Sequence, residues 1–161
     1  MNYKELDKAK FDAIVTGELT HYAIWLEGEL VNIISDYFVT EEAKVEDFNR
    51  LLLLRDGLTF QDKIEIVRAM SELFNENESK KLKTLLKKIE AFKKWRNAMA
   101  HGRDVSNDEA TPSLKIQIVS RSGKENTIEI TPESHTKMLE EADLLLNEVQ
   151  NLRKKIKFSF Q

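Results

Sequence analysis

The chain has 161 residues, 41% of them hydrophobic and 33% charged, a composition typical of one globular domain over residues 1–161. The absence of cysteine excludes disulfides, Cys-ligated zinc and thiol nucleophiles, and three histidines leave little for a metal site, so we expect neither metal nor cofactor. A net charge of −3 argues against general polyanion binding. Without a run of about 18 apolar residues or an apolar leader, we expect a cytoplasmic protein with no membrane contact.

The first predicted helices come from apolar residues that recur at steps of three and four. One such stripe predicts a long helix over residues 18–38. A shorter helix precedes it, and we expect Gly17 to separate the two. A further short helix is expected to start at Phe48 and to stop at Asp56-Gly57.

Two more helices are predicted before residue 103. Thr59 is placed to cap a helix that runs to Phe74, by accepting a hydrogen bond from a backbone N–H of the first turn. A polar stretch then predicts a break, with Ser79 as the cap of a helix that ends near His101. Gly102 fits the position just past that helix end.

After a loop over 103–113, the apolar period changes from about 3.6 to 2. Alternating apolar residues on both sides of a Ser122-Gly123 turn predict a β-hairpin over about 114–130. Thr131-Pro132 then begins the last helix, with proline in its first turn. The expected fold class is all-α, a four- to five-helix bundle with a small hairpin inserted before the last helix.

One segment, Lys93 to Arg103, departs from an ordinary bundle. The apolar seam of its helix places Arg96 where a hydrophobic residue is expected, and a buried guanidinium costs several kcal/mol unless it is paired or borders water. Asn97 and His101, four residues apart, share a face. Arg96 and His101 are five residues apart, roughly 140° around an ideal helix. A frayed helix end, or a second copy of the chain, could still bring the guanidinium and the imidazole together.

Structural explanations stay open beside a catalytic one. A histidine at a helix C-terminus is a favoured capping cation and needs no catalytic role. Arg96 could pair with a bundle carboxylate such as Glu27 or Glu29. Of the other histidines, we expect His21 to be partly exposed and His135 to be solvated in the first turn of the last helix.

The segment Arg96-Asn97-Ala98-Met99-Ala100-His101 resembles the R-x(4–6)-H motif of the HEPN superfamily, in its R-N-x-x-x-H form. The glycine after the histidine is also similar to that family, as is the place of the motif near the end of the penultimate long helix. The resemblance to the HEPN bundle as a whole covers residues 18–156. The resemblance implies a metal-independent endoribonuclease. It also implies a homodimer, in which two motifs face each other in one composite cleft.

The same resemblance implies a role for each residue of the motif. His101 would act as general acid–base on the ribose 2′-hydroxyl or the leaving oxygen, Arg96 would hold the scissile phosphate, and Asn97 would orient the phosphate or the histidine. These residue types suit the chemistry, because an imidazole of pKa about 6.5 exchanges protons at neutral pH and a guanidinium forks onto phosphate oxygens. The implied biology is that of a toxin or antiviral defence effector, with a cognate antitoxin or a nucleotidyltransferase as candidate partner.

The net charge of −3 argues against polyanion binding by the whole surface, but one segment is strongly basic. Residues 80–103 hold nine basic residues against one acid, Glu90, a local charge of +8. Such a basic track would steer RNA to the motif, with Lys93, Lys94 and Arg103 as its RNA-binding residues, and the affinity would fall with salt. The alternative is a non-catalytic dimeric module that uses the same crevice to bind RNA, a nucleotide or a partner protein.

Overall fold

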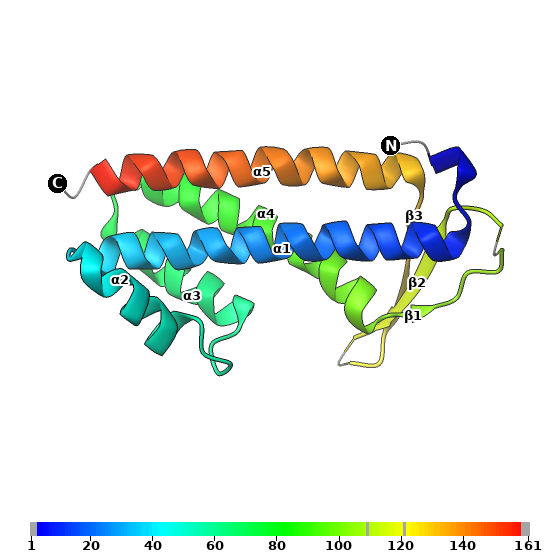
Figure 1. The fold of residues 1–161 in the computed structure, drawn as a ribbon, viewed down its shortest axis with the longest axis horizontal. Helices are drawn as coiled ribbons and strands as arrows, with labels where there is room; N and C mark the ends of the chain where they lie inside the picture. Colours follow the sequence, from blue (N-terminus) through cyan, green and yellow to red (C-terminus); the bar gives the residue numbers. More distant parts are fainter. Residues whose placement is uncertain (1–2, 109, 121, 159–161) are drawn as a thin grey trace. The chain divides into compact units, whose positions relative to one another are not determined.

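The protein was analysed as a computed structural model, which describes residues 3–108, 110–120 and 122–158. These residues are mostly helical and include a small antiparallel sheet (Figure 1). The five α-helices and three strands are α1 (Lys8–Phe38), α2 (Glu42–Phe48), α3 (Phe60–Met70), α4 (Glu76–His101), β1 (Arg103–Asp104), β2 (Leu114–Val119), β3 (Glu125–Ile130) and α5 (Pro132–Phe158). Short 3₁₀ turns cover Tyr3–Glu5 and Ser71–Leu73.

The backbone contacts divide the chain into two compact units. The first, called the sheet unit here, comprises Met1–Ala23 and Ala91–Asp143. The second, called the helical unit, comprises Ile24–Glu90 and Leu144–Gln161. The helices α1, α4 and α5 each contribute one segment to each unit. The motif of α4 and the three strands therefore belong to the sheet unit.

The helical unit buries apolar side chains from α1, α3, α4 and α5. Its core includes Leu26, Leu30, Ile33, Ile64, Val67, Leu82, Leu86, Ile89 and Val149. Lys63 lies in this core with 4% of its surface exposed, and its ammonium is paired with Glu27. That pairing is required physically, because a buried charge without a partner strongly destabilises a fold.

Helix caps show where local sequence signals hold. Thr59 caps α3 as predicted, in a capping box: its hydroxyl accepts from the Asp62 N–H, and the Asp62 carboxylate accepts from the Thr59 N–H at 2.8 Å. The predicted start of α4 is wrong. Asn75 caps the helix by accepting from the Glu78 N–H at 3.0 Å, and Ser79 is buried inside the first turns. Asparagine caps a helix as well as serine does, so the helix can begin four residues earlier than predicted.

The short helix expected from Phe48 is also shifted. α2 starts at Glu42, and the chain continues into a π-helical turn over Asn49–Leu53. Leu53 is buried, whereas its neighbours Leu51, Leu52 and Leu54 are exposed. None of the residues of α2 is buried, so this helix has no buried apolar stripe from which the sequence could predict it.

The expected break at Gly17 is wrong, because α1 is continuous through it. Phe11, Val15 and Leu19 are fully buried at four-residue steps on both sides of the glycine. The backbone of Gly17 faces open space. A glycine inside a helix costs about 1 kcal/mol relative to alanine, and the packing of this stripe outweighs that amount.

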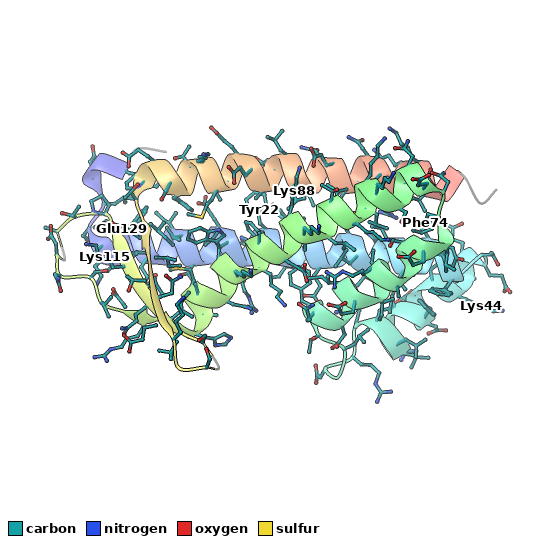
Figure 2. The ribbon with its side chains drawn as sticks, turned by 180° about the vertical axis from the view of Figure 1, so that it is seen from behind. Tyr22, Lys44, Phe74, Lys88, Lys115 and Glu129 are labelled. Carbon is teal, nitrogen blue, oxygen red and sulfur yellow. The ribbon has the colours of Figure 1, made fainter. Side chains whose placement is uncertain are left out.

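The predicted hairpin is confirmed and gains a third strand. β2 pairs with β3, and Lys115 stands opposite Glu129 with their charged atoms 3.8 Å apart (Figure 2). The turn uses Gly123 at φ +80°, a conformation that glycine adopts without strain. The expected loop from residue 103 begins instead with β1, which pairs antiparallel with β2, giving the order β1-β2-β3. Thr131 caps α5 as predicted, accepting from the Ser134 N–H at 3.3 Å.

His135, expected to be solvated, is fully buried in the sheet unit. Its Nδ1 lies 2.9 Å from the Tyr3 hydroxyl, and its ring stands edge-on to Tyr3 and Phe11. Nε2 lies 3.2 Å from Oε2 of Glu18, although neither atom completes a hydrogen bond with any described residue. Burial lowers the pKa of His135 and raises the pKa of Glu18, so the fold favours the uncharged form of each group.

Candidate functional site

The helix end that carries the motif is fixed by contact with the sheet. α4 ends at His101, and the Gly102 N–H donates to the Ala98 carbonyl at 2.7 Å. A Cβ at residue 102 would lie 2.2 Å from Cγ2 of Ile116 on β2. Gly102 follows the helix as predicted, but the reason for glycine differs: among the described residues only Gly123 has a positive φ. Close packing of β2, rather than a left-handed cap, excludes a side chain there.

Arg96 and Asn97 are brought together at this helix end. Both side chains are half-buried, and Arg96 Nη1 donates to Asn97 Oδ1 at 3.2 Å. The seam position predicted for Arg96 accounts for this partial burial. The amide oxygen satisfies one N–H of the guanidinium and leaves its other donors available to an anion.

The carboxylates suggested as structural partners of Arg96 are engaged elsewhere, within the helical unit. Glu27 pairs with Lys63. Glu29 lies 3.5 Å from Nη1 of Arg153. The explanation of Arg96 as one half of an ion pair with either carboxylate therefore has no support from these contacts.

His101 is not joined to the other two residues of the motif. It is exposed in the last turn of α4, and within the described part of the chain it has no hydrogen bond or ion pair. This agrees with the angular separation of about 140° expected for residues five apart on a helix. A single chain thus presents a half-buried Arg96–Asn97 pair and a separate, solvent-facing imidazole.

The three cations predicted beside the motif differ in exposure. Lys94 and Arg103 are exposed, and Lys93 is half-buried. Next to Arg103 on β1, the carboxylate of Asp104 lies 2.7 Å from the ammonium of Lys8. Although partial desolvation opposes it, hydrogen bonds from Lys8 and Ser106 lower the pKa of Asp104 to about 2. This end of the motif segment therefore carries a fixed negative charge as well as positive ones.

The basic track is partly neutralised along α4. Three of its lysines are within 2.7 Å of a carboxylate, in the pairs Lys80–Glu76, Lys83–Glu72 and Lys88–Glu148. Exposed pairs of this kind stabilise a fold by less than about 1 kcal/mol each, but they lower the local field. The local charge of +8 counted along the sequence therefore overstates the attraction for RNA.

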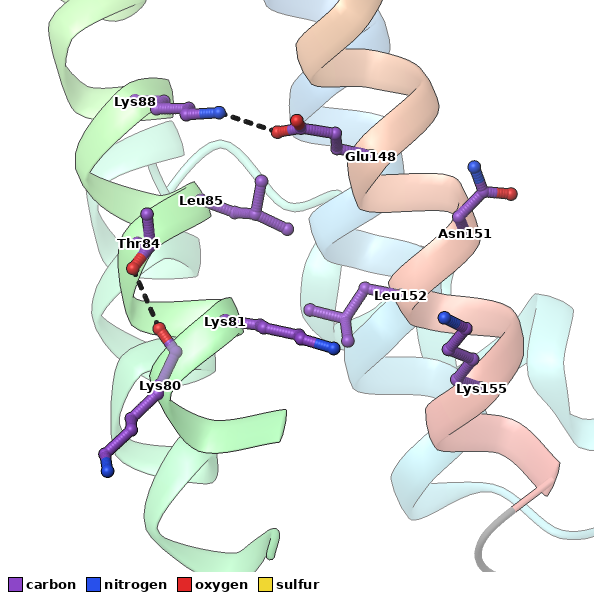
Figure 3. A pocket seen from close by; sticks show the side chains of 9 residues that line it. All are labelled: Lys80, Lys81, Thr84, Leu85, Lys88, Glu148, Asn151, Leu152 and Lys155. Atoms are coloured by element: carbon purple, nitrogen blue, oxygen red, sulfur yellow. Dashed lines mark hydrogen bonds and ion pairs between the residues drawn. The ribbon is translucent and has the colours of Figure 1, made fainter. Parts of the chain in front are cut away.

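One basic feature is invisible in the sequence. In the helical unit, α4 and α5 enclose a groove of about 490 Å³, called the lysine groove here (Figure 3). It is lined by Lys80, Lys81, Thr84, Leu85, Lys88, Glu148, Asn151, Leu152 and Lys155. Three of its lysines lie within residues 80–88 and the fourth, Lys155, lies on another helix, so the sequence alone does not show that they line one groove.

Two kinds of feature are absent from the described ranges. No three His, Asp or Glu side chains within them are grouped closely enough to bind a metal ion. No helix within them is both long and apolar enough to cross a membrane.

The chain was compared with models of protein families, with curated proteins and with solved structures, and none of the three comparisons found a match. The chemistry of the site therefore has to be judged from its own residues.

Proposed function

We propose that the chain is a metal-independent endoribonuclease of the HEPN type, with Arg96, Asn97 and His101 as its catalytic residues. One observation carries the proposal: the Arg96–Asn97 hydrogen bond presents a half-buried guanidinium and amide at a helix end that also exposes an imidazole. Phosphoryl transfer needs a fixed positive charge and a group that exchanges protons near neutral pH. The segment supplies both, and it follows the motif that the sequence resembles.

The reaction follows from these groups. An imidazole accepts the proton of the ribose 2′-hydroxyl, and the 2′-oxygen attacks the adjacent phosphorus. The bond from phosphorus to the 5′-oxygen of the next nucleotide breaks, and that oxygen receives a proton from an imidazolium. Arg96 stabilises the charge that develops on the phosphoryl oxygens, since a guanidinium donates two parallel hydrogen bonds to them. The products are a 2′,3′-cyclic phosphate and a 5′-hydroxyl.

A second copy of the chain completes this site. No contact within one chain links His101 to Arg96 or Asn97 among the described residues. In a dimer, His101 of one copy would act on a phosphate that Arg96 of the other copy holds. The pair of imidazoles would then serve as base and acid on opposite sides of the scissile bond.

The first test is cleavage of labelled RNA in buffer that contains EDTA. We expect the wild type to cut, His101→Ala to lose about 10²–10⁴-fold and Arg96→Ala about 10²–10³-fold in rate. His21→Ala and Arg55→Ala, which change exposed residues of the same types, are the matched controls and should keep full activity. Cleavage that survives both motif substitutions would refute the site. RNA binding without cleavage by the wild type would favour the non-catalytic module.

The second test asks which copy supplies each residue. Arg96→Ala and His101→Ala proteins, each inactive alone, are mixed and allowed to exchange subunits. A cleft that takes Arg96 from one copy and His101 from the other regains part of its activity in the mixed dimer, which keeps one of the two imidazoles. A solution mass equal to the 18.7 kDa of one chain would contradict the composite cleft.

A further inference from the structure

The lysine groove has a strongly unequal charge on its walls. Lys80, Lys81 and Lys88 come from α4 and Lys155 from α5, against a single acid, Glu148. Glu148 is already engaged, with its carboxylate 2.7 Å from the Lys88 ammonium at one end of the groove (Figure 3). The groove therefore carries a net charge of +3 from four lysines and one glutamate. Such a surface attracts anions.

Lys81 and Lys155 lie at the opposite end of the groove. Figure 3 shows Lys81 reaching from α4 toward Leu152, with Lys155 beside it on α5. No ion pair joins Lys81 to a carboxylate in the described part of the chain, unlike Lys80, which pairs with Glu76 at 2.6 Å. An anion in the groove would therefore be stabilised by the Lys81 ammonium.

The floor of the groove limits the chemistry of its ligand. Leu85 and Leu152 form the apolar part, and they are only 7% and 5% exposed. A peptide that docks through apolar anchors would therefore bury little surface here. The lining contains no aromatic side chain on which a base could stack, so base recognition is not favoured either. The remaining way for this groove to bind a ligand is attraction between its ammonium groups and a chain of negative charges.

We propose that the lysine groove binds the phosphate backbone of RNA, without reading its sequence. The lining residues span 80–88 on α4, about 12 Å at 1.5 Å per residue. At roughly 3.4 Å per nucleotide of a stacked strand, this length accommodates about three phosphates. The identification of the ligand as RNA rests on the proposed function, whereas the attraction for a polyanion rests on the groove alone.

The test measures the salt dependence of binding rather than affinity alone. A labelled single-stranded RNA is titrated with His101→Ala protein, which is not expected to cut it, at several salt concentrations. Each phosphate contact contributes about 0.7 to the slope of log affinity against log salt. The double variant Lys81→Gln/Lys155→Gln should lower this slope by at least about 0.7, the contribution of Lys81, and by up to about 1.4. The control Lys10→Gln/Lys44→Gln removes the same charge from two exposed lysines outside the groove and should leave the slope unchanged.

A variant that should bind RNA more tightly distinguishes a loss of groove charge from damage to the fold. Glu148→Gln removes the only acid of the groove and releases Lys88. We expect tighter RNA binding with a slope steeper by about 0.7. Damage to the fold would weaken binding instead.

The outcomes separate the two proposals. Equal slopes for the groove variant and its control would overturn the groove assignment, and so would weaker binding by Glu148→Gln. Stronger displacement of the labelled RNA by polyglutamate than by unlabelled RNA at equal charge would overturn RNA as the ligand and favour an acidic protein. Binding through the groove by a wild type that never cuts RNA would refute the nuclease and leave the groove assignment standing.

Discussion

Alanine at position 102 would place a methyl group where two neighbours already lie. Its Cβ would be 2.2 Å from Cγ2 of Ile116 and 2.5 Å from the carbonyl oxygen of Ala98. Carbon atoms in favourable contact are about 3.5–4.0 Å apart, so both distances are severe overlaps. Ile116 is buried and the oxygen belongs to the backbone of α4. Relief therefore requires β2 to move away from residue 102 and the backbone between residues 98 and 102 to shift.

The expected loss of stability follows from these contacts. Forcing an extra methyl group into a packed site costs about 1–3 kcal/mol. The shift of this backbone also endangers the 2.7 Å hydrogen bond from Gly102 to Ala98, which contributes about 1 kcal/mol. The reduced backbone freedom of the unfolded chain offsets about 0.4–1 kcal/mol. We expect a net destabilisation of about 2 kcal/mol, or about 4–8 °C in melting temperature for a chain of this length.

Urea unfolding of the wild type and two alanine variants measures this effect. Gly17→Ala is the matched control, because nothing lies within 4 Å of a Cβ there and the residue is inside a helix. We expect Gly17→Ala to stabilise the protein by about 0.5–1 kcal/mol, opposite in sign to Gly102→Ala.

A double-mutant cycle identifies the contact. Ile116→Ala removes the methyl group that the new Cβ would overlap, so the two substitutions together should cost less than the sum of their separate effects. Wild-type stability in Gly102→Ala would refute the reasoning. Strict additivity with Ile116→Ala would show that the isoleucine is not the cause.

Two further predictions concern pH. Because burial lowers the pKa of His135, the unfolded chain takes up a proton more readily than the folded one, so stability should decrease as the pH falls below about 6.5. His135→Phe should flatten that part of a plot of unfolding free energy against pH, and an unchanged profile would contradict the effect. The pKa of Asp104 is lowered to about 2 in the folded protein, so the ionised carboxylate stabilises the fold above about pH 4. This stabilisation is lost as the pH falls toward 2. Lys8→Gln should reduce that loss, by less than about 1 kcal/mol because Asp104 is 38% exposed, and acid titration of the two proteins by circular dichroism would reveal it.

Signals contained in neighbouring residues predicted the structure well. The Thr59 cap, the turn at Gly123 and the start of α5 after Thr131 each depend on a few adjacent residues and on backbone geometry. The half-buried position of Arg96 followed from the spacing of one helix seam. In each case the deciding interaction lies within a few residues of sequence.

Features decided by distant contacts were missed. The burial of His135 depends on Tyr3 and Phe11, more than a hundred residues away in the chain. The lysine groove requires Lys81 and Lys155 to line one space from two different helices. The requirement for a glycine at 102 comes from a strand that follows it by more than ten residues. Periodicity within a segment contains no information about such contacts.

The joint between α4 and the sheet consists of one residue. His101 ends the helix, Gly102 is packed against Ile116, and Arg103 already pairs with Gln117. Because this connection is so short, the backbone that carries the exposed imidazole is already held in place in the free protein. Ordering a flexible segment would consume part of the binding free energy, whereas a preorganised one spares it. Amide hydrogen exchange at residues 98–104 should therefore be slow in the free protein and change little when RNA is added.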